Sequence, residues 1–284
     1  MNPRTHAFAT PTPPKLRIDI PRGRITIAAS DTGETEISLF APRGDADALA
    51  WIDQTEIADI GGEIVVRNPV RRWFGLIHCG PIEATIKTPI GAAATLTMGA
   101  GKVETTGVLG PVTANTGAGN VRIEACGEAR LRTGSGNVEV ERASGGVDAK
   151  TGAGQVTIRA AGADVRVTTG AGSAHLGEIA GAARLTTGHG DIEIEHAGGG
   201  AVEAFTAAGN IEVMRADRGL VRAKTVSGRV SVGVPAGVAA LLDISTMSGR
   251  VRSDLAASGP PGDGEPHVEL VLSTVSGNVN VARA

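Results

Sequence analysis

The pentapeptide Thr187–Asp191, TGHGD, is the stretch that comes closest to a calcium-binding turn. Toxin-type β-rolls also repeat about every eighteen residues, with glycine-rich turns whose carboxylates form a ladder of calcium ligands. In other copies of this motif, however, Lys102, Asn120 and Arg229 occupy the position of Asp191. A cation at a ligand position opposes calcium binding, so we do not expect a calcium site.

Three histidines, His175, His189 and His196, also lie close together in the sequence. The alignment of the repeats places His175 beside Glu193, His189 at a corner and His196 in the following turn. Zinc ligands would have to converge on one point, and these positions do not. We therefore expect exposed histidines, with no metal and no cofactor.

Six carboxylates share one face of the repeats: Glu139, Glu141, Asp191, Glu193, Glu195 and Glu212. Parallel β-helix lyases and esterases gather such groups over adjacent coils to act on sugars. Here Thr157, Arg159, Ser173 and His175 separate the two clusters, and no sugar-stacking aromatic residues accompany them. We therefore predict that the protein is not an enzyme, and a carbohydrate-active β-helix enzyme ranks third among the readings.

The elements that would position these side chains belong to an internal repeat. Its marker is the last glycine of T-G-x-G, and the period is about eighteen residues: Gly101, Gly119, Gly136, Gly154, Gly172, Gly190, Gly209, Gly228, Gly249 and Gly277. Apolar residues alternate both before and after the marker, which is the pattern of two short strands. The sequence therefore predicts an all-β parallel β-solenoid with two-strand coils and an irregular N-terminal cap.

The motif itself is predicted to be a structural corner. The threonine methyl can pack inward while its hydroxyl bonds a neighbouring turn, and glycine supplies the positive φ of a tight corner. Stacked asparagines can satisfy such turns, as Asn120, Asn137, Asn210 and Asn278 would. The corner ladder consists of Thr116, Thr133, Thr151, Thr169, Thr187, Gly119, Gly136, Gly154, Gly172 and Gly190.

Three segments follow from this pattern: a disordered tail over residues 1–15, an irregular β region over 16–97 and regular coils over 98–284 with an inserted loop at 256–267. The coil Leu270–Val281 looks uncapped, and a bare edge pairs readily. In the irregular region we expect a short helix at 45–53 and strands at 16–20, 24–28, 36–40, 56–60, 63–67 and 83–87.

Composition limits the possible partners and location. The formal net charge is −3, which gives no reason to expect nucleic-acid binding. Neither a signal-peptide core nor a long apolar run is seen, so we expect a cytoplasmic protein that does not insert into a membrane. Cys79 and Cys126 are expected to be reduced, partly buried thiols, although the sequence leaves a disulfide open.

The outward positions of the two strands differ in charge, which predicts one acidic and one basic face. Such faces suit docking of a charged protein partner or self-association. Aromatic and aliphatic residues at Trp73–Ile77 and Phe205 are either part of the cap or anchors for a partner. The partner-binding candidates are Trp73, Phe74, Leu76, Ile77, Phe205, Arg130, Arg132, Arg166, Arg184, Glu139, Glu141, Glu193 and Glu195.

The successive T-G-x-G-x-V units follow an opening LRIDIPRGRITIAASDTGETEISL. Together they resemble the Toastrack family of bacterial putative adhesins, a β-strand-repeat domain of unknown function. The resemblance implies a non-catalytic β-solenoid linked to envelope-stress or regulatory systems, and it carries over no catalytic or ligand residues. The sequence thus predicts a binding or scaffold protein, with a self-assembling, filament-like structural protein as the alternative.

Overall fold

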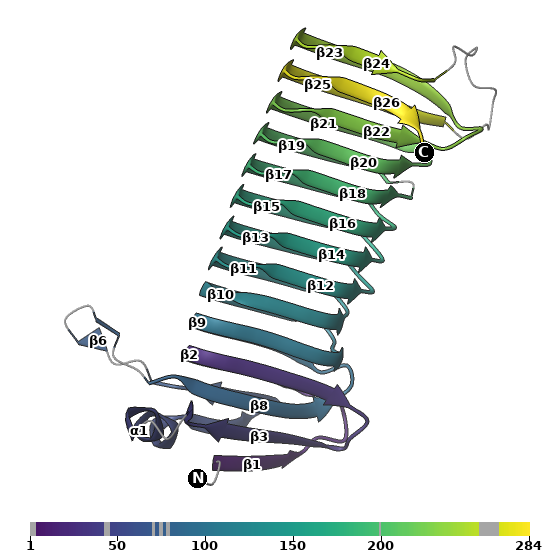
Figure 1. The fold of residues 1–284 in the computed structure, drawn as a ribbon. Coiled ribbons are helices and arrows are strands. Elements are labelled where there is room, and N and C mark those ends of the chain that lie inside the picture. The colour runs from purple at the N-terminus through teal and green to yellow at the C-terminus, as the bar shows by residue number, and fades with distance from the viewer. Residues whose placement is uncertain are drawn as a thin grey trace. The chain divides into compact units, whose positions relative to one another are not determined.

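The computed structural model describes residues 4–42, 46–69, 72–73, 76–77, 80–198, 200–255 and 267–284. The chain divides into two compact units, Met1–Arg142 and Ala143–Ala284. Each unit consists of strands that stack mainly in parallel (Figure 1). The boundary falls within the regular repeats, whereas the sequence predicts the change between segments at residues 97 and 98.

Among its described residues, the first unit holds one helix and the irregular strands. The predicted helix is confirmed, and so are the predicted strands at 36–40, 56–60, 63–67 and 83–87, whereas the two predicted at 16–20 and 24–28 form one continuous strand. Residues Arg4–Ala9 form a strand, so the expectation of a disordered tail over residues 1–15 is wrong there. The elements are β1 (Arg4–Ala9), β2 (Lys15–Ser30), β3 (Glu34–Phe40), α1 (Ala46–Gln54), β4 (Glu56–Ile60), β5 (Glu63–Arg67), β6 (Arg72–Trp73), β7 (Leu76–Ile77), β8 (Ile82–Pro89), β9 (Ala93–Val108), β10 (Val112–Cys126), β11 (Ala129–Ser135) and β12 (Val138–Ala143).

Strand β2 is a complete coil in the middle of the first unit. One of its edges pairs in parallel with β5 and β8, and the other pairs with β9 over almost its full length. Ile18 stands in register with Val66 on one side and Leu96 on the other. All three side chains are buried, and burying one such chain contributes roughly 1.5–3 kcal/mol.

Antiparallel strands close the N-terminal edge of this unit. Strand β3 pairs antiparallel with β8, β1 pairs antiparallel with β3, and β4 pairs antiparallel with β5. The Arg4 guanidinium donates hydrogen bonds to the carbonyls of Ile52 and Thr55, at 2.7 and 2.8 Å, and so ties β1 to the end of α1. These elements form the predicted irregular cap.

The second unit contains the regular coils, each made of two short strands. Its strands are β13 (Val147–Ala153), β14 (Val156–Ala161), β15 (Val165–Ala171), β16 (Ala174–Ile179), β17 (Ala183–His189), β18 (Ile192–Ala197), β19 (Val202–Ala208), β20 (Ile211–Ala216), β21 (Gly219–Ser227), β22 (Val230–Val234), β23 (Ala239–Ser248), β24 (Val251–Ser253), β25 (His267–Ser276) and β26 (Val279–Arg283).

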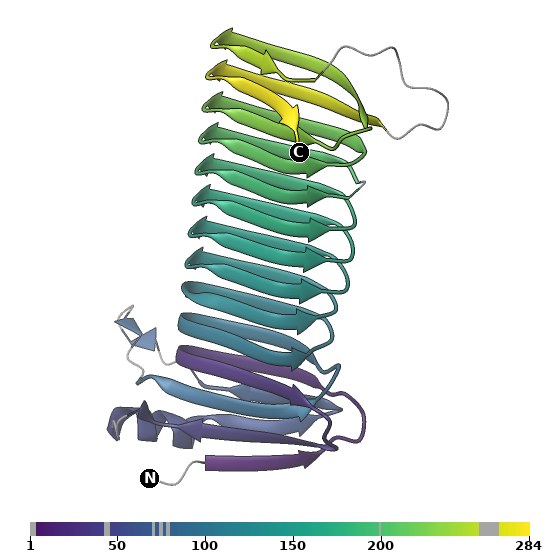
Figure 2. The ribbon, with the colours of Figure 1, turned by 45° about the vertical axis from the view of Figure 1, so that its right-hand side comes forward.

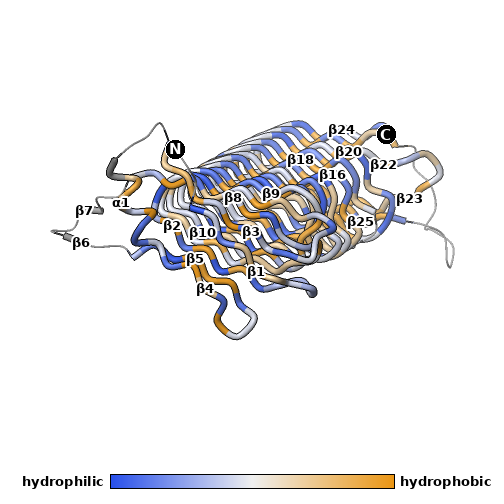
Figure 3. The backbone as a smooth tube through the Cα atoms, turned by 90° about the horizontal axis from the view of Figure 1, so that it is seen from below, coloured by the Kyte–Doolittle hydropathy of each residue, from blue (hydrophilic) through white to orange (hydrophobic). Residues whose placement is uncertain are grey.

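Equivalent residues stack in register from coil to coil. Val167, Leu185 and Ala204, for example, are successive partners on β15, β17 and β19. These residues, and every second residue along the same strands, are buried, while the residues between them face outward. Hydrophobic and hydrophilic residues therefore alternate along each strand (Figure 3). The alternation predicted from the sequence is therefore the core of the solenoid.

The last coil in the sequence is not the last coil of the second unit. Strand β25 pairs with β21 on one edge and with β23 on the other, and β26 lies in the same way between β22 and β24. Figure 2 shows the yellow C-terminal coil inside the stack, with β23 and β24 beyond it. Leu270 and Val281 are both 0% exposed, so the prediction that Leu270–Val281 is uncapped is wrong. The inserted loop 256–267, apart from His267 in β25, lies outside the described residues.

Candidate functional site

Several threonines of the repeat bind the corner of the preceding coil, in both units. In the first unit, the Thr133 hydroxyl donates to the carbonyl of Gly119 at 3.1 Å. In the second, Thr187 donates to Gly172 at 3.1 Å and Thr206 to Gly190 at 3.1 Å. These side chains are buried, so they form a structural ladder and are not accessible to a ligand.

The glycines of the ladder differ in one place from the prediction. Gly136, Gly154, Gly172 and Gly190 have φ between +140° and +148°. Gly119 lies inside β10 and has a φ outside the left-handed region. A Cβ at Gly119 would nevertheless lie 2.1 Å from the Gly101 carbonyl oxygen, so close stacking alone requires glycine there.

A second ladder explains the carboxylate of TGHGD. In the first unit the side chain of Asn120 accepts a hydrogen bond from the backbone N–H of Asn137, at 2.9 Å. Asp191 does the same in the second unit: its Oδ1 accepts from the backbone N–H of Asn210 at 2.7 Å. Asp191 is therefore one rung of a ladder that satisfies corner amides. In the described part of the chain, no three His, Cys, Asp or Glu side chains are grouped to hold a metal ion.

The acidic candidates of the first unit lie in ion pairs with one arginine. Arg122 on β10 contacts Glu139 and Glu141 on β12, each at 3.1 Å. Lys102 and Glu104 on β9 pair at 2.6 Å. These ion pairs between basic and acidic side chains neutralise much of the predicted acidic face in this unit.

A hollow of about 660 Å³ opens beside these ion pairs. It lies at a β-bulge, where the register of β9 and β10 shifts between Ile123 and Ala125. The shift frees the backbone N–H of Gly107, which donates to the Glu124 carboxylate at 3.1 Å. Sequence reasoning missed this hollow, since the extra residues of β9 leave the alternating pattern intact. Its lining comprises Thr26, Glu104, Thr105, Thr106, Arg122, Glu124 and Glu141.

The acidic candidates of the second unit gather around a histidine. His175 on β16 contacts Glu193 at 3.1 Å and Glu195 at 2.9 Å, both on β18. The register of β16, β18 and β20 places Glu212 next to Glu193. The predicted pairing of His175 with Glu193 is present, and Glu195 adds a second carboxylate to it.

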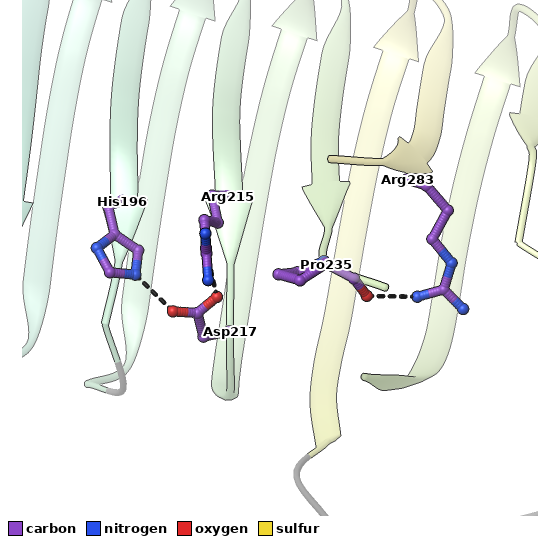
Figure 4. Close-up of polar contacts among 5 residues, drawn as sticks. All are labelled: His196, Arg215, Asp217, Pro235 and Arg283. Carbon is purple, nitrogen blue, oxygen red and sulfur yellow. Dashed lines mark hydrogen bonds and ion pairs between the residues drawn. The ribbon is translucent and has the colours of Figure 1, made fainter. Parts of the chain in front are cut away.

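The sequence predicted His196 in a turn, but it lies in β18. Its side chain contacts Asp217 (Figure 4). Its Nε2 lies 2.5 Å from Oδ2 of Asp217, while Nε of Arg215 donates to Oδ1 at 2.7 Å. The hydrogen bond from Arg215, and then the one with His196, hold the pKa of Asp217 below its usual value. His196 and Arg215 are register partners on β18 and β20, so Asp217 bridges two coils.

The basic candidates of the second unit line the outward face of its odd-numbered strands. Asp148, Arg166, Arg184, Glu203 and Arg222 form one column in register across β13, β15, β17, β19 and β21. A neighbouring column carries Lys150 and Lys224, with Phe205 between Thr186 and Lys224. Phe205 is 38% exposed, so it does not belong to the core.

The remaining candidates lie in the first unit. Arg130 and Arg132 are exposed on β11, and the nearest carboxylate to Arg130 is Glu128 at 3.8 Å. Where the sequence suggests a loop, Trp73 in β6 pairs antiparallel with Leu76 in β7, next to Ile77. Phe74 lies outside the described residues.

Of the two cysteines, Cys126 lies in the described part of the chain. Cys126 at the end of β10 is buried, and burial raises the pKa of its thiol to about 11. Such a thiol stays protonated at neutral pH and is a poor nucleophile. Cys79 lies outside the described residues.

Known proteins match this arrangement of repeats. The family model Toastrack DUF4097 matches residues 15–282. The chain belongs to the Toastrack DUF4097 family. No curated protein matches the sequence.

Solved structures are similar to this Toastrack protein at low sequence identity. A putative adhesin from Bacteroides fragilis is 11% identical, with 100% of this chain and 97% of that chain covered and a TM-score of 0.41. A putative adhesin from Parabacteroides distasonis is 13% identical, with 98% and 97% covered and a TM-score of 0.42. A putative lipid binding protein from the same organism is 11% identical, with 99% and 96% covered and a TM-score of 0.38.

The structure also bears on membrane insertion. Within the described ranges, the one helix has nine residues and is too short to cross a membrane.

Proposed function

We propose that this Toastrack protein is a non-catalytic binding or scaffold protein that docks an acidic protein partner. The binding surface is the outward face of β13, β15, β17, β19 and β21, which we call the basic sheet face. It carries five cations, Lys150, Arg166, Arg184, Arg222 and Lys224, against two carboxylates, Asp148 and Glu203.

The observation that carries the proposal is that four of these five cations lack an acidic partner. Arg184 pairs with Glu203 at 2.7 Å. In the described part of the chain, no carboxylate lies within ion-pair distance of the other four: Lys150, Arg166, Arg222 and Lys224. Unpaired surface cations attract an acidic partner and speed its encounter.

The same face offers contact area as well as charge. Neighbouring strands are about 4.8 Å apart, so the register partners Arg166 and Arg184 lie close together on this face. Phe205 stands exposed on the same face. Arginine and aromatic side chains are the residues that most often dominate binding energy at interfaces, and the strands hold them in fixed positions.

The carboxylates support a binding role over a catalytic one. Glu139 and Glu141 lie in ion pairs with Arg122, Glu124 accepts from a backbone amide, and Asp191 satisfies a corner amide. Each therefore has a structural partner, whereas a general acid or base needs a free position beside a substrate. The second unit also carries an acidic cluster on β18 and β20, which would let a scaffold hold partners of both signs.

The proposal is tested by the affinity for polyglutamate, a probe for acidic protein surfaces. Arg166→Glu with Lys224→Glu should weaken binding about tenfold or more at low salt. The matched control, Arg218→Glu with Arg229→Glu, changes the net charge equally at exposed sites outside the basic sheet face and should change binding much less. Equal losses in both variants would show that only the total charge matters and would contradict the proposal.

A further inference from the structure

In the described part of the second unit, the outermost coil, β23 and β24, has one edge that pairs with no other strand. Within the described ranges, β23 pairs only with β25, and β24 pairs only with β26. The other edge of this coil, which we call the end coil, presents the backbone amides and carbonyls of a ten-residue strand. Such an edge is a template for another strand.

The end coil also exposes apolar side chains that other coils bury. Leu242 stands in register with Leu270, yet Leu242 is 41% exposed and Leu270 is 0% exposed. Val251 is 49% exposed, whereas its partner Val279 is 1% exposed. Leu241 and Met247 add outward apolar surface at 46% and 85% exposure. A patch of this kind on a soluble protein marks an interaction site.

The apolar surface continues from the end coil along the corner of the solenoid. The residue after the motif threonine is glycine after Thr116, Thr133, Thr151, Thr169 and Thr187, and it is alanine after Thr206. A Cβ at Gly134 would lie 2.5 Å from the Gly117 carbonyl oxygen. In the three coils at this end the same position holds Val226, Val275 and Met247, which directly follow the register partners Thr225, Thr274 and Thr246. They are 41%, 40% and 85% exposed. The sequence thus replaces glycine with exposed apolar side chains only near the end coil.

We propose that the end coil is the interface of a closed homodimer, in which two copies of this chain meet edge to edge about a two-fold axis. An identical strand edge can satisfy the backbone groups of β23 by antiparallel pairing, and a two-fold axis makes the contact self-complementary. Each copy would then cover the apolar residues of the other. No third chain is needed.

The charges of the end coil favour a second copy over a charged partner. Asp243, Arg250, Arg252 and Asp254 sum to zero. Two copies therefore do not repel each other, and the acids of one can face the bases of the other. The neutral end coil is also poorly suited to the strongly acidic partner proposed for the basic sheet face.

The size of the end coil fits a stable dimer. Ten residues of strand extend about 33 Å, and two sheets about 10 Å apart with their outward side chains extend about 20 Å. The contact then covers about 650 Å² per copy, or about 1,300 Å² in total, within the range of specific interfaces. The corner valines add to the apolar border of this area.

The first test is the mass in solution, measured by light scattering from about 1 to 100 μM. We expect the mass to rise from one chain to two and to stop at two, with little effect of salt because the contact is mainly apolar. Leu241→Lys with Met247→Lys should weaken association about tenfold or more. The control, Ile60→Lys with Val108→Lys, changes two apolar residues of the first unit that are 57% and 51% exposed, and it should leave association unchanged.

A second test does not depend on a variant. In hydrogen exchange, the amides of β23 should gain protection as the concentration rises, while those of β17, inside the stack, should not change. A single-chain mass at every concentration would overturn the proposal. Growth beyond two chains would instead indicate head-to-tail assembly, and a dimer unaffected by the lysine variant would place the interface elsewhere. Polyglutamate binding does not enter these readouts, so this proposal and the proposed function can fail separately.

Discussion

Asp217 receives hydrogen bonds from two neighbouring coils, through Arg215 and His196. Both contacts favour the carboxylate and lower its pKa. An acid with a lowered folded pKa contributes stability above its ordinary pKa, about 3.9, and this contribution is lost as the pH falls through the folded value. Asp217→Asn should therefore lower the melting temperature at pH 7 by about 1–3 °C. The difference from the unmodified protein should shrink as the pH drops below about 4.

Thermal unfolding followed by circular dichroism checks this prediction at several pH values. Asp31→Asn, at an exposed position, is the control and should not change the melting temperature. If Asp217→Asn lowers the melting temperature by the same amount down to pH 2, the charge of Asp217 does not contribute to stability. The sequence did not reveal this pair, because Asp217 follows β20 and lies outside the alternating strand pattern.

The elements are held together at their corners by the threonine ladder. Thr225 is fully buried and its hydroxyl donates to the Gly209 carbonyl at 2.9 Å, whereas the buried hydroxyl of Thr169 has no hydrogen-bond partner among the described residues. Thr225→Val keeps the shape but removes the donor, so it should reduce the free energy of unfolding by about 1–2 kcal/mol. The same change at Thr169 relieves an unsatisfied hydroxyl and should be neutral or stabilising. Urea denaturation of the two variants measures the difference, and equal effects would show that the ladder bond adds no stability.

Local elements were the most predictable part of the molecule. A strict period of two, interrupted by T-G-x-G, predicted the strands of the regular coils and their corners, because inward side chains must be apolar and corners must be tight. The bulge beside Glu124 and the strand of Arg4–Ala9 were not predictable in this way. Both depend on which distant strand offers a free edge, and the periodicity of one strand does not contain that information.

At the scale of the whole molecule, the order of coils is what the sequence concealed. Repeats of similar pattern can stack in more than one order, since the inward residues of β23 and β25 are equally apolar and equally spaced. The sequence pattern of Leu270–Val281 therefore suggested a terminal coil, while the structure inserts that coil between β21 and β23. The candidate residues of the charged faces were identified from the alternation along each strand, but their partners, such as Glu193 and Glu195 for His175, depend on which strands lie side by side.

Cysteine pairs can determine the order of coils directly. Ser276 is the register partner of both Ser227 and Ser248, and all three side chains are exposed. Adjacent strands place such Cα atoms about 4.8 Å apart, within disulfide range, whereas strands two coils apart are about 9.6 Å apart. In a Cys79→Ser background, Ser227→Cys with Ser276→Cys and Ser248→Cys with Ser276→Cys should each form a disulfide on oxidation. Ser227→Cys with Ser248→Cys should not, as judged by mass spectrometry of unreduced peptides. A stack that follows the order of the sequence would instead link Cys at 227 and 248 and leave 227 and 276 unlinked, so the three variants separate the two arrangements without further assumptions.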